Sequence, residues 1–492
     1  MNKYNENKTK TLQKASLLTL CLLSSLLVTA CGSANNAYEK EAYSNFTVDK
    51  EKYQLDKVIV ISRHNIRSPL TDGEPGSGCL SELTNHEWFK WTSAPSELSL
   101  KGAQLETQFA QYFHSYLVDN NFIIENPTTK DVENSFYFRS NSMQRTIATA
   151  KYFSSALLPN ANVSVHSESI DATNEDKDEI KNYHMEDLFL PGYTFYSDSY
   201  VNKFNEEINE YIKPLAKSLD DNYKLLESVL DYKNSIESKT KLTTFSVDDV
   251  VAVFPSKENI EGKDNGKKEN TFKSHTSLKV GNTAVDALKL QYYEEEDENK
   301  ASFGKKLTYE DWVKIGEIGD VYSKALFTLP SFAPHLAHPL LNEINNQLLG
   351  IDDQDIKRSE HKFAFYCGHD SNIASVLAAL GAKGYVAGKE EYNKYLLPQS
   401  IEKLTPIGSK IMIERWKDNS NENYYSISLT YQNLNQLRNG KSLTLDNPPI
   451  KFELELEGLT KNNDKLYKES DFLNLVQNKV DLDAKIKETY KD

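Results

Sequence analysis

Hydrophobic and polar positions follow two different periods along this chain, and each period predicts one kind of element. Continuous apolar runs at 58–61 (VIVI) and 363–367 (FAFYC) are typical of strands that are buried on both faces of a sheet. The later segments 410–416, 424–431 and 450–459 alternate in period two and predict strands that close the sheet. The two ends of the chain therefore contribute to one sheet.

Helical spacing dominates the intervals between these runs. Apolar residues lie on one face of a helix that is expected to begin at about Lys101. An aromatic strand at 135–139 leads into a second helix, which carries Arg145 in its first turns. From about 167 to 303 the chain consists of long charged segments with short apolar patterning, which predicts an inserted helical domain.

These elements predict an α/β fold in which a mixed sheet is flanked by helices and carries an inserted helical cap domain. We place the α/β domain at 51–166 and 304–492 and the cap domain at 167–303. Residues 31–50, which are mostly polar, are expected to form a flexible tether.

Residues 1–30 are typical of a targeting segment, because lysines precede an apolar run at 15–28. The run ends in LVTAC, which resembles the bacterial lipobox and predicts that Cys31 is lipidated and becomes the mature amino terminus. Gly32 is not an aspartate, so the lipobox resemblance implies the periplasmic face of the outer membrane in the cell envelope. An ordinary signal peptide and a membrane anchor are the alternatives, although the run is short for a spanning helix.

The formal net charge of -15 argues against nucleic acid and against electrostatic attachment to anionic lipid. Membrane contact is expected only through Cys31, and the oligomeric state stays open. We find no cluster of His, Asp and Glu that suggests a metal, and we expect no cofactor. Once Cys31 carries lipid, Cys79 and Cys367 remain, either as a disulfide or as two separate thiols.

The candidate chemistry begins where the first buried strand ends, in the segment 57–70 (KVIVISRHNIRSPL). The carboxyl ends of strands in an α/β sheet are where ligands bind, so Arg63, His64 and Arg67 lie where chemistry is expected. Two guanidinium groups bind a phosphate by paired hydrogen bonds and hold its phosphorus beside the imidazole. Nearby cations also favour the neutral imidazole, which is the nucleophilic form. A surface loop with three solvated cations is the plain alternative.

A second polar pair, His369 and Asp370, follows the strand at 363–367 and so has the same topological position as His64. An acid is what the first cluster lacks, so the two strand ends are stronger evidence together than either is alone. Arg145 begins a helix beside a third strand end, where backbone N–H groups favour an anion, and is a candidate third phosphate ligand.

With RHNIRSP near the start, QRT at 144–146 and HDSN at 369–372, the sequence resembles the histidine acid phosphatases, whose signature is RHGxRxP with a distal HD. It is most similar to the glucose-1-phosphatase branch, which carries Asn at the signature glycine, as Asn65 does here. The likeness extends through LKVGNTAVDALKLQYYE, TPIG and QLRNGKSLTL, and so covers nearly the whole mature chain.

This resemblance implies a phosphoglycerate-mutase-like fold and two-step hydrolysis of a small phosphomonoester, with glucose 1-phosphate and related sugar phosphates as the expected substrates. His64 attacks phosphorus and forms a phosphohistidine, and Asp370 protonates the leaving alkoxide. The equatorial oxygens are held by Arg63, Arg67, Arg145 and His369. The same resemblance puts Glu294 at the pocket mouth, where it restricts substrate entry; simple surface charge is the alternative.

Three features depart from the family. Arg139 stands where a small residue is expected, the segment at about 167–191 is longer, and the late chain lacks cysteine pairs. A phytase that acts on inositol hexakisphosphate is the rival enzyme, although Asn65 and HDSN favour the narrower branch. Two further functions stay open: a lipoprotein that binds sugar phosphates without catalysis, and a phosphohistidine mutase.

Overall fold

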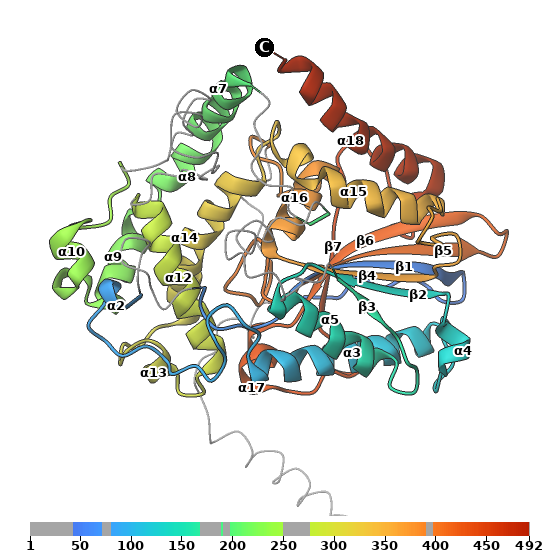
Figure 1. Cartoon of the computed structure of the whole chain (residues 1–492), viewed down its shortest axis with the longest axis horizontal. Helices are drawn as coiled ribbons and strands as arrows, with labels where there is room; N and C mark the ends of the chain where they lie inside the picture. The colour runs from blue at the N-terminus through green and yellow to red at the C-terminus, as the bar shows by residue number, and fades with distance from the viewer. Residues whose placement is uncertain are drawn as a thin grey trace, which may run out of the picture. The chain divides into compact units, whose positions relative to one another are not determined.

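The computed structural model describes residues 43–70, 80–167, 188–189, 197–248, 276–389 and 397–491. Its centre is an eight-stranded mixed sheet in the order β3-β2-β4-β1-β5-β6-β7, with β8 paired to β6 (Figure 1). The strands are β1 Tyr53–Arg63, β2 Phe136–Ser140, β3 Val165–His166, β4 Phe363–Gly368, β5 Lys410–Asp418, β6 Asn423–Tyr431, β7 Ile450–Glu453 and β8 Tyr467–Lys468.

The first half of the sheet is parallel and the second half antiparallel. Strands β3, β2, β4 and β1 run in one direction, and β5 to β8 pair antiparallel beyond β1. The predicted strand at 450–459 is shorter than expected, because only Ile450–Glu453 pairs with β6. Beyond β7, Leu456 forms an isolated bridge with Ala382, which lies just after the end of α16.

Helices cover both faces of this sheet (Figure 1). Alternate residues of β1 enter opposite cores: Val58 and Val60 lie in the core of one face, and Ile59 and Ile61 in the core of the other. The first face is covered by α3 Leu100–Asp119 and α5 Gln144–Leu157, and the second by α15 Ala333–Leu349, α16 Asp370–Leu380 and α18 Glu469–Thr489. The predicted mixed sheet flanked by helices is therefore confirmed.

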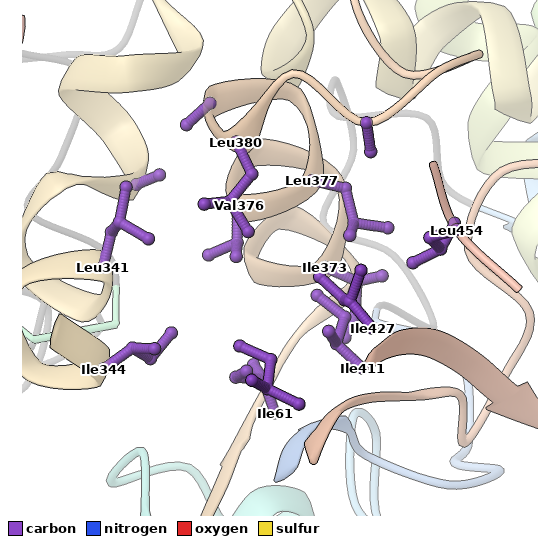
Figure 2. Packing of buried hydrophobic residues seen from close by; sticks show 14 of the residues in the cluster. Ile61, Leu341, Ile344, Ile373, Val376, Leu377, Leu380, Ile411, Ile427 and Leu454 are labelled. Atoms are coloured by element: carbon purple, nitrogen blue, oxygen red, sulfur yellow. The ribbon is translucent and has the colours of Figure 1, made fainter. Parts of the chain in front are cut away.

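The second core fixes α16, the helix that begins at the site. In Figure 2 Ile373, Val376, Leu377 and Leu380 of α16 lie between Leu341 and Ile344 of α15 and the sheet residues Ile61, Ile411 and Ile427. Every one of these side chains is buried. Such close packing holds the first turn of α16 in one position relative to the strand ends.

The described part of the predicted cap region is helical. It contains α7 Asp198–Glu207, the π-helix η2 Ile208–Ile212, α8 Lys213–Lys217, α9 Asp220–Leu230, the 3-10 helix η3 Tyr232–Asn234, α10 Ile236–Thr240, α12 Ser277–Glu294 and α13 Glu298–Ala301. Helix α14, Tyr309–Phe327, lies beyond the predicted boundary and packs against α12 and α9. The remaining short helices are α2 Leu80–Leu83, α4 Thr129–Val132 and α17 Leu434–Asn439.

The described end of the predicted tether is anchored to the sheet. The Tyr43 hydroxyl donates to the Lys451 carbonyl at 2.9 Å, and the Phe46 amide donates to the same carbonyl at 3.1 Å. Tyr43 also stacks on Phe452, with ring centroids 5.7 Å apart. From residue 43 onward the chain is therefore held along β7.

Candidate active site

Three parallel strands end side by side and deliver the site residues to one edge of the sheet. Arg63 at the end of β1 pairs with Gly368 at the end of β4, and Ser140 at the end of β2 pairs with Cys367. The next residues of these strands are therefore neighbours: the His64 amide donates to the Gly368 carbonyl at 3.0 Å. This register places His64 and His369 at the same edge of the sheet, which is where the strand-end rule locates them from the sequence.

His64 is buried and held in one tautomer. Its Nδ1 lies 2.8 Å from the Asn65 carbonyl oxygen, which accepts only a hydrogen bond, so Nδ1 carries the proton and Nε2 keeps its lone pair. Burial lowers the pKa of His64 well below its ordinary value, and the charges of Arg145 and Arg67 lower it further. A neutral imidazole with a free Nε2 is the form that attacks an electrophile.

Arg63, at the base of the site, is held by two carboxylates. Its Nη1 lies 2.9 Å from Glu402 Oε1, and its Nη2 lies 3.7 Å from Asp370 Oδ2. Although burial disfavours its charged form, Glu402 and Asp370 raise the pKa of Arg63 above the ordinary value. Burial would raise the pKa of Glu402, but Lys289 and Arg63 outweigh this effect and lower it to about 2.

Arg67 and Arg145 complete a cluster of three buried guanidinium groups. Arg67 pairs with Asp286 of α12, with each of its Nη atoms 3.1 Å from the carboxylate. Burial lowers the pKa of Arg145 to about 10, and Arg67 contributes to the same shift. In the part of the chain that the structure describes, the Nε atoms of Arg63, Arg67 and Arg145 are buried without a hydrogen-bond partner. Three such donors predict an anionic ligand.

His369 and Asp370 sit at the start of α16. The His369 amide donates to Asn372 Oδ1 at 2.8 Å, which closes a capping box. Its ring lies beside that of His64, with centroids 5.6 Å apart, and its Nε2 lies 3.1 Å from Asn141 Oδ1. Burial and Arg145 lower the pKa of His369 to about 3, so the ring is neutral.

Close approach at this turn explains the residue before His369. A Cβ atom on Gly368 would lie 2.3 Å from Asn372 Oδ1 and 2.9 Å from the Phe189 ring. Only glycine therefore allows the Asn372 side chain to reach back to the His369 amide.

Asp370 lies at the same cavity as His64, with its side chain 39% exposed. Burial raises its pKa, but Arg63, His369 and Arg67 outweigh this effect and hold the pKa below the ordinary value. The carboxyl group is therefore open to a ligand and surrounded by cations.

These groups line a cavity of about 470 Å³ between the strand ends and the helices α12 and α14. The charged lining side chains balance among the described residues: four cations (Arg63, Arg67, Arg145 and Lys289) face four carboxylates (Asp286, Asp320, Asp370 and Glu402). Asn282, Thr283, Tyr322 and Ser323 add neutral hydrogen-bonding groups. Such a cavity suits one phosphate together with a polar, uncharged remainder.

Sequence reasoning missed the carboxylates that orient the arginines. Asp286 holds Arg67, and Glu402 holds Arg63, Lys289 at 3.0 Å and the Tyr293 hydroxyl at 2.9 Å. A signal for this was present, because Asn282, Asp286, Lys289 and Tyr293 recur at helical spacing and form a polar stripe on an otherwise apolar helix face.

A buried network under the nucleophile was also missed. Asn65 donates from Nδ2 to Glu106 Oε2 at 2.9 Å, and Lys410 Nζ lies 2.9 Å from Glu106 Oε1. The Glu106 and Lys410 side chains are both fully buried. Lys410 also donates to Ser62 Oγ at 2.9 Å, so the network ties β1, α3 and β5 together around the loop that carries His64.

Two residues singled out from the sequence lie elsewhere. Glu294 accepts a hydrogen bond from Ser99 Oγ at 2.9 Å and is not among the described residues that line the catalytic cavity. Burial raises its pKa, and the Ser99 hydrogen bond opposes that shift. Arg139 lines a separate cavity of about 800 Å³ together with His166 and His361.

Some of the predicted features fall on residues outside the described ranges. Cys31, the possible partner Cys79 and most of the longer segment at 167–191 belong to this group. Cys367 is fully buried in β4, and burial raises the pKa of its thiol.

The described ranges contain no group of three or more His, Cys, Asp or Glu side chains arranged to hold a metal ion. A search of the same ranges for a helix with the length and hydrophobicity to cross a bilayer also finds none.

A family model described as histidine phosphatase superfamily (branch 2) matches residues 54–432. A glucose-1-phosphatase of Providencia rettgeri is 31% identical over 447 residues, which are 90% of this chain and 94% of that protein. A phytase of Escherichia coli is 20% identical over 424 residues, covering 85% of this chain and 90% of that protein.

Among solved structures, a Hafnia alvei phytase in complex with myo-inositol hexakis sulphate is similar, with a TM-score of 0.70 and 22% identity. The match covers 87% of this chain and 97% of the phytase chain. At this identity the likeness supports the fold.

Proposed function

The chain belongs to branch 2 of the histidine phosphatase superfamily, and from this premise we propose that it hydrolyses sugar phosphates such as glucose 1-phosphate through a phosphohistidine. The observation that carries the proposal is the neutral His64 with a free Nε2, in one cavity with three buried arginines and Asp370. In this proposal the same side chains carry both chemical steps.

In the first step, His64 Nε2 attacks phosphorus and the bond between phosphorus and the sugar oxygen breaks. The arginines Arg63, Arg67 and Arg145 bind the phosphoryl oxygens and stabilise the charge that they gain in the transition state. Arg145 Nη2 lies 3.4 Å from His369 Nδ1, which orients this guanidinium group beside the nucleophile. Phosphorus becomes bonded to His64, and the sugar leaves with the electron pair of the broken bond.

Asp370 supplies the proton that the leaving sugar oxygen needs. Its low pKa in the free site results from Arg63, His369 and Arg67, which outweigh the effect of burial. A bound phosphate dianion offsets the arginine charges and so raises this pKa, which favours the protonated acid when substrate is present. In the second step, Asp370 takes a proton from water, and the resulting hydroxide attacks phosphorus and releases His64.

The charge balance of the cavity favours one phosphate over many. In the described part of the lining four cations meet four carboxylates, so binding of inositol hexakisphosphate would place further phosphates beside Asp286 and Asp320. A neutral sugar instead meets Asn282, Thr283 and Ser323, which donate and accept hydrogen bonds to hydroxyls. The likeness to phytases in fold and family keeps phytase as the second candidate.

Initial rates on glucose 1-phosphate and inositol hexakisphosphate test which of the two candidate functions is right. We expect a higher kcat/KM on glucose 1-phosphate than on inositol hexakisphosphate, and we expect activity to persist in the presence of a chelator. The variant His64→Ala should show no turnover. A preference for inositol hexakisphosphate would make the protein a phytase. Binding of glucose 1-phosphate without hydrolysis of any phosphomonoester would make it a binding protein.

We propose a lipid anchor on Cys31 at the periplasmic face of the outer membrane as well. The motif LVTAC and the glycine at position 32 support this proposal. Expression in a Gram-negative host with labelled palmitate should give a labelled product that fractionates with outer membrane. Cys31→Ser should lose the label, whereas Cys21→Ser, within the apolar run, should keep it.

A further inference from the structure

A second hollow opens beside the catalytic cavity. It has a volume of about 460 Å³, and Pro69 and Leu80 belong to the walls of both. A ligand whose phosphate lies among the arginines can therefore extend past these two residues without leaving the protein surface. We call this hollow the aromatic groove, after its lining residues Trp88, Phe89 and Trp91.

The groove differs chemically from the cavity that it joins. Its described lining residues are aromatic, aliphatic, proline or serine, and none of them carries a charge. Phe89 and Trp91 meet edge to face, with ring centroids 5.2 Å apart. The Trp88 indole donates to the Leu80 carbonyl at 2.9 Å, and the Phe89 amide donates to Gln291 Oε1 at 2.7 Å. These contacts hold the rings in place before any ligand arrives.

A serine of the groove offers a polar atom to a ligand. Ser93 lines the groove, and its Oγ is buried without a hydrogen-bond partner among the described residues. A hydroxyl both donates and accepts, so Ser93 matches a hydroxyl of a sugar.

We propose that the aromatic groove binds a second, neutral sugar ring attached to the phosphorylated one, so that phosphorylated disaccharides are substrates. This inference rests on the proposed sugar-phosphatase activity. The C–H face of a pyranose packs on aromatic rings, and its hydroxyl reaches Ser93. Among the described lining residues a further phosphate would lose its hydration without meeting a cation, and a nucleobase would find no side-chain amide or carboxylate to pair with its edge.

The test compares α-maltose 1-phosphate with α-glucose 1-phosphate. We expect Trp91→Ala to lower kcat/KM on α-maltose 1-phosphate by about tenfold relative to kcat/KM on α-glucose 1-phosphate, because the ring that stacks on the second sugar is lost. Trp91→Phe keeps an aromatic ring and should retain most of the ratio. Tyr152→Ala removes an aromatic side chain that is 45% exposed on α5, away from both hollows, and should leave the ratio unchanged.

The outcomes separate this inference from the proposed function. If the wild-type protein hydrolyses glucose 1-phosphate and Trp91→Ala leaves the ratio unchanged, the second sugar site is wrong and the activity stands. If neither sugar phosphate is hydrolysed, the proposed function itself fails. Adenosine monophosphate serves as a third substrate. If Trp91→Ala lowers kcat/KM on adenosine monophosphate more than on α-maltose 1-phosphate, the groove binds a nucleobase and the proposed second sugar site is wrong.

Discussion

At the scale of single residues, Asp370 decides which leaving groups the site can expel. A sugar alkoxide needs a proton as it leaves, whereas a nitrophenolate is stable without one. We therefore expect Asp370→Asn to lower kcat/KM on glucose 1-phosphate at least about 100-fold and to affect p-nitrophenyl phosphate far less. Equal losses on both substrates would remove Asp370 from the acid role.

The pH dependence of the same residue has a definite sign. The acid works only while it is protonated, so the rate on glucose 1-phosphate should fall as pH rises through the pKa of Asp370 in the complex. Phosphate binding offsets Arg63 and Arg67, which with His369 lower this pKa in the free site. We expect the fall of kcat with rising pH to disappear in Asp370→Asn. The measurement is the pH profile of kcat for the variant and the wild-type protein.

The buried pair Glu106 and Lys410 is a second residue-scale feature with a measurable consequence. Neither side chain is exposed, so Glu106→Gln leaves the Lys410 charge without its counter-ion. We expect a loss of about 3 kcal/mol in the free energy of unfolding, measured by denaturant titration. The double variant Glu106→Leu with Lys410→Met buries no charge and should recover much of that loss. Failure to recover would show that the network with Asn65 and Ser62 matters beyond charge compensation.

At the scale of elements, the sequence predicted what depends on local patterning. The apolar runs located β1 and β4, and the strand-end rule then placed His64 beside His369 in the parallel register. Side-chain partners between distant elements were not predictable. The polar stripe of α12 indicates that Asp286 has a polar neighbour, but nothing local identifies Arg67 as that neighbour or Glu402 as the partner of Arg63. Glu294 is another side chain whose partner could not be predicted. It accepts a hydrogen bond from Ser99, the N-cap residue of α3, and a family resemblance alone does not reveal this contact.

The carboxyl-terminal helix α18 carries a buried carboxylate where it meets α15. Asp483 lies 2.9 Å from His335 Nδ1 of α15 and 2.9 Å from Lys487 Nζ, and its side chain is 3% exposed. Burial would raise its pKa, but His335 and Lys487 outweigh this effect and lower the pKa below the ordinary value. A carboxyl group whose pKa is lower in the folded state stabilises the fold above its unfolded pKa, near 3.9, and loses that contribution as pH falls toward the folded pKa.

We therefore expect Asp483→Asn to lower the free energy of unfolding by about 2 kcal/mol at pH 7. The difference from wild type should shrink as pH falls below about pH 4. Unfolding monitored at several pH values gives this curve. Asp481→Asn, two residues away on the same helix, is the matched control. Among the described residues its carboxylate accepts a hydrogen bond from Gln477, and the change should alter stability little.

At the scale of the whole molecule, the charge of the chain and the charge of its cavity act differently on an anionic substrate. The formal net charge is -15, while the described side chains that line the cavity balance at four of each sign. Within about one Debye length of the surface, roughly 10 Å at 0.1 M salt, an approaching phosphate is repelled by the net negative charge, while the buried arginines are offset by the carboxylates beside them. Added salt should therefore raise kcat/KM on glucose 1-phosphate and raise it more steeply on inositol hexakisphosphate, whose charge is larger.

Measurements of kcat at saturation serve as the control, because salt screening of the encounter leaves the bound state unchanged. A decrease of kcat/KM with salt would instead reveal cationic steering, and the charge balance of the cavity would then no longer explain a preference for single phosphates.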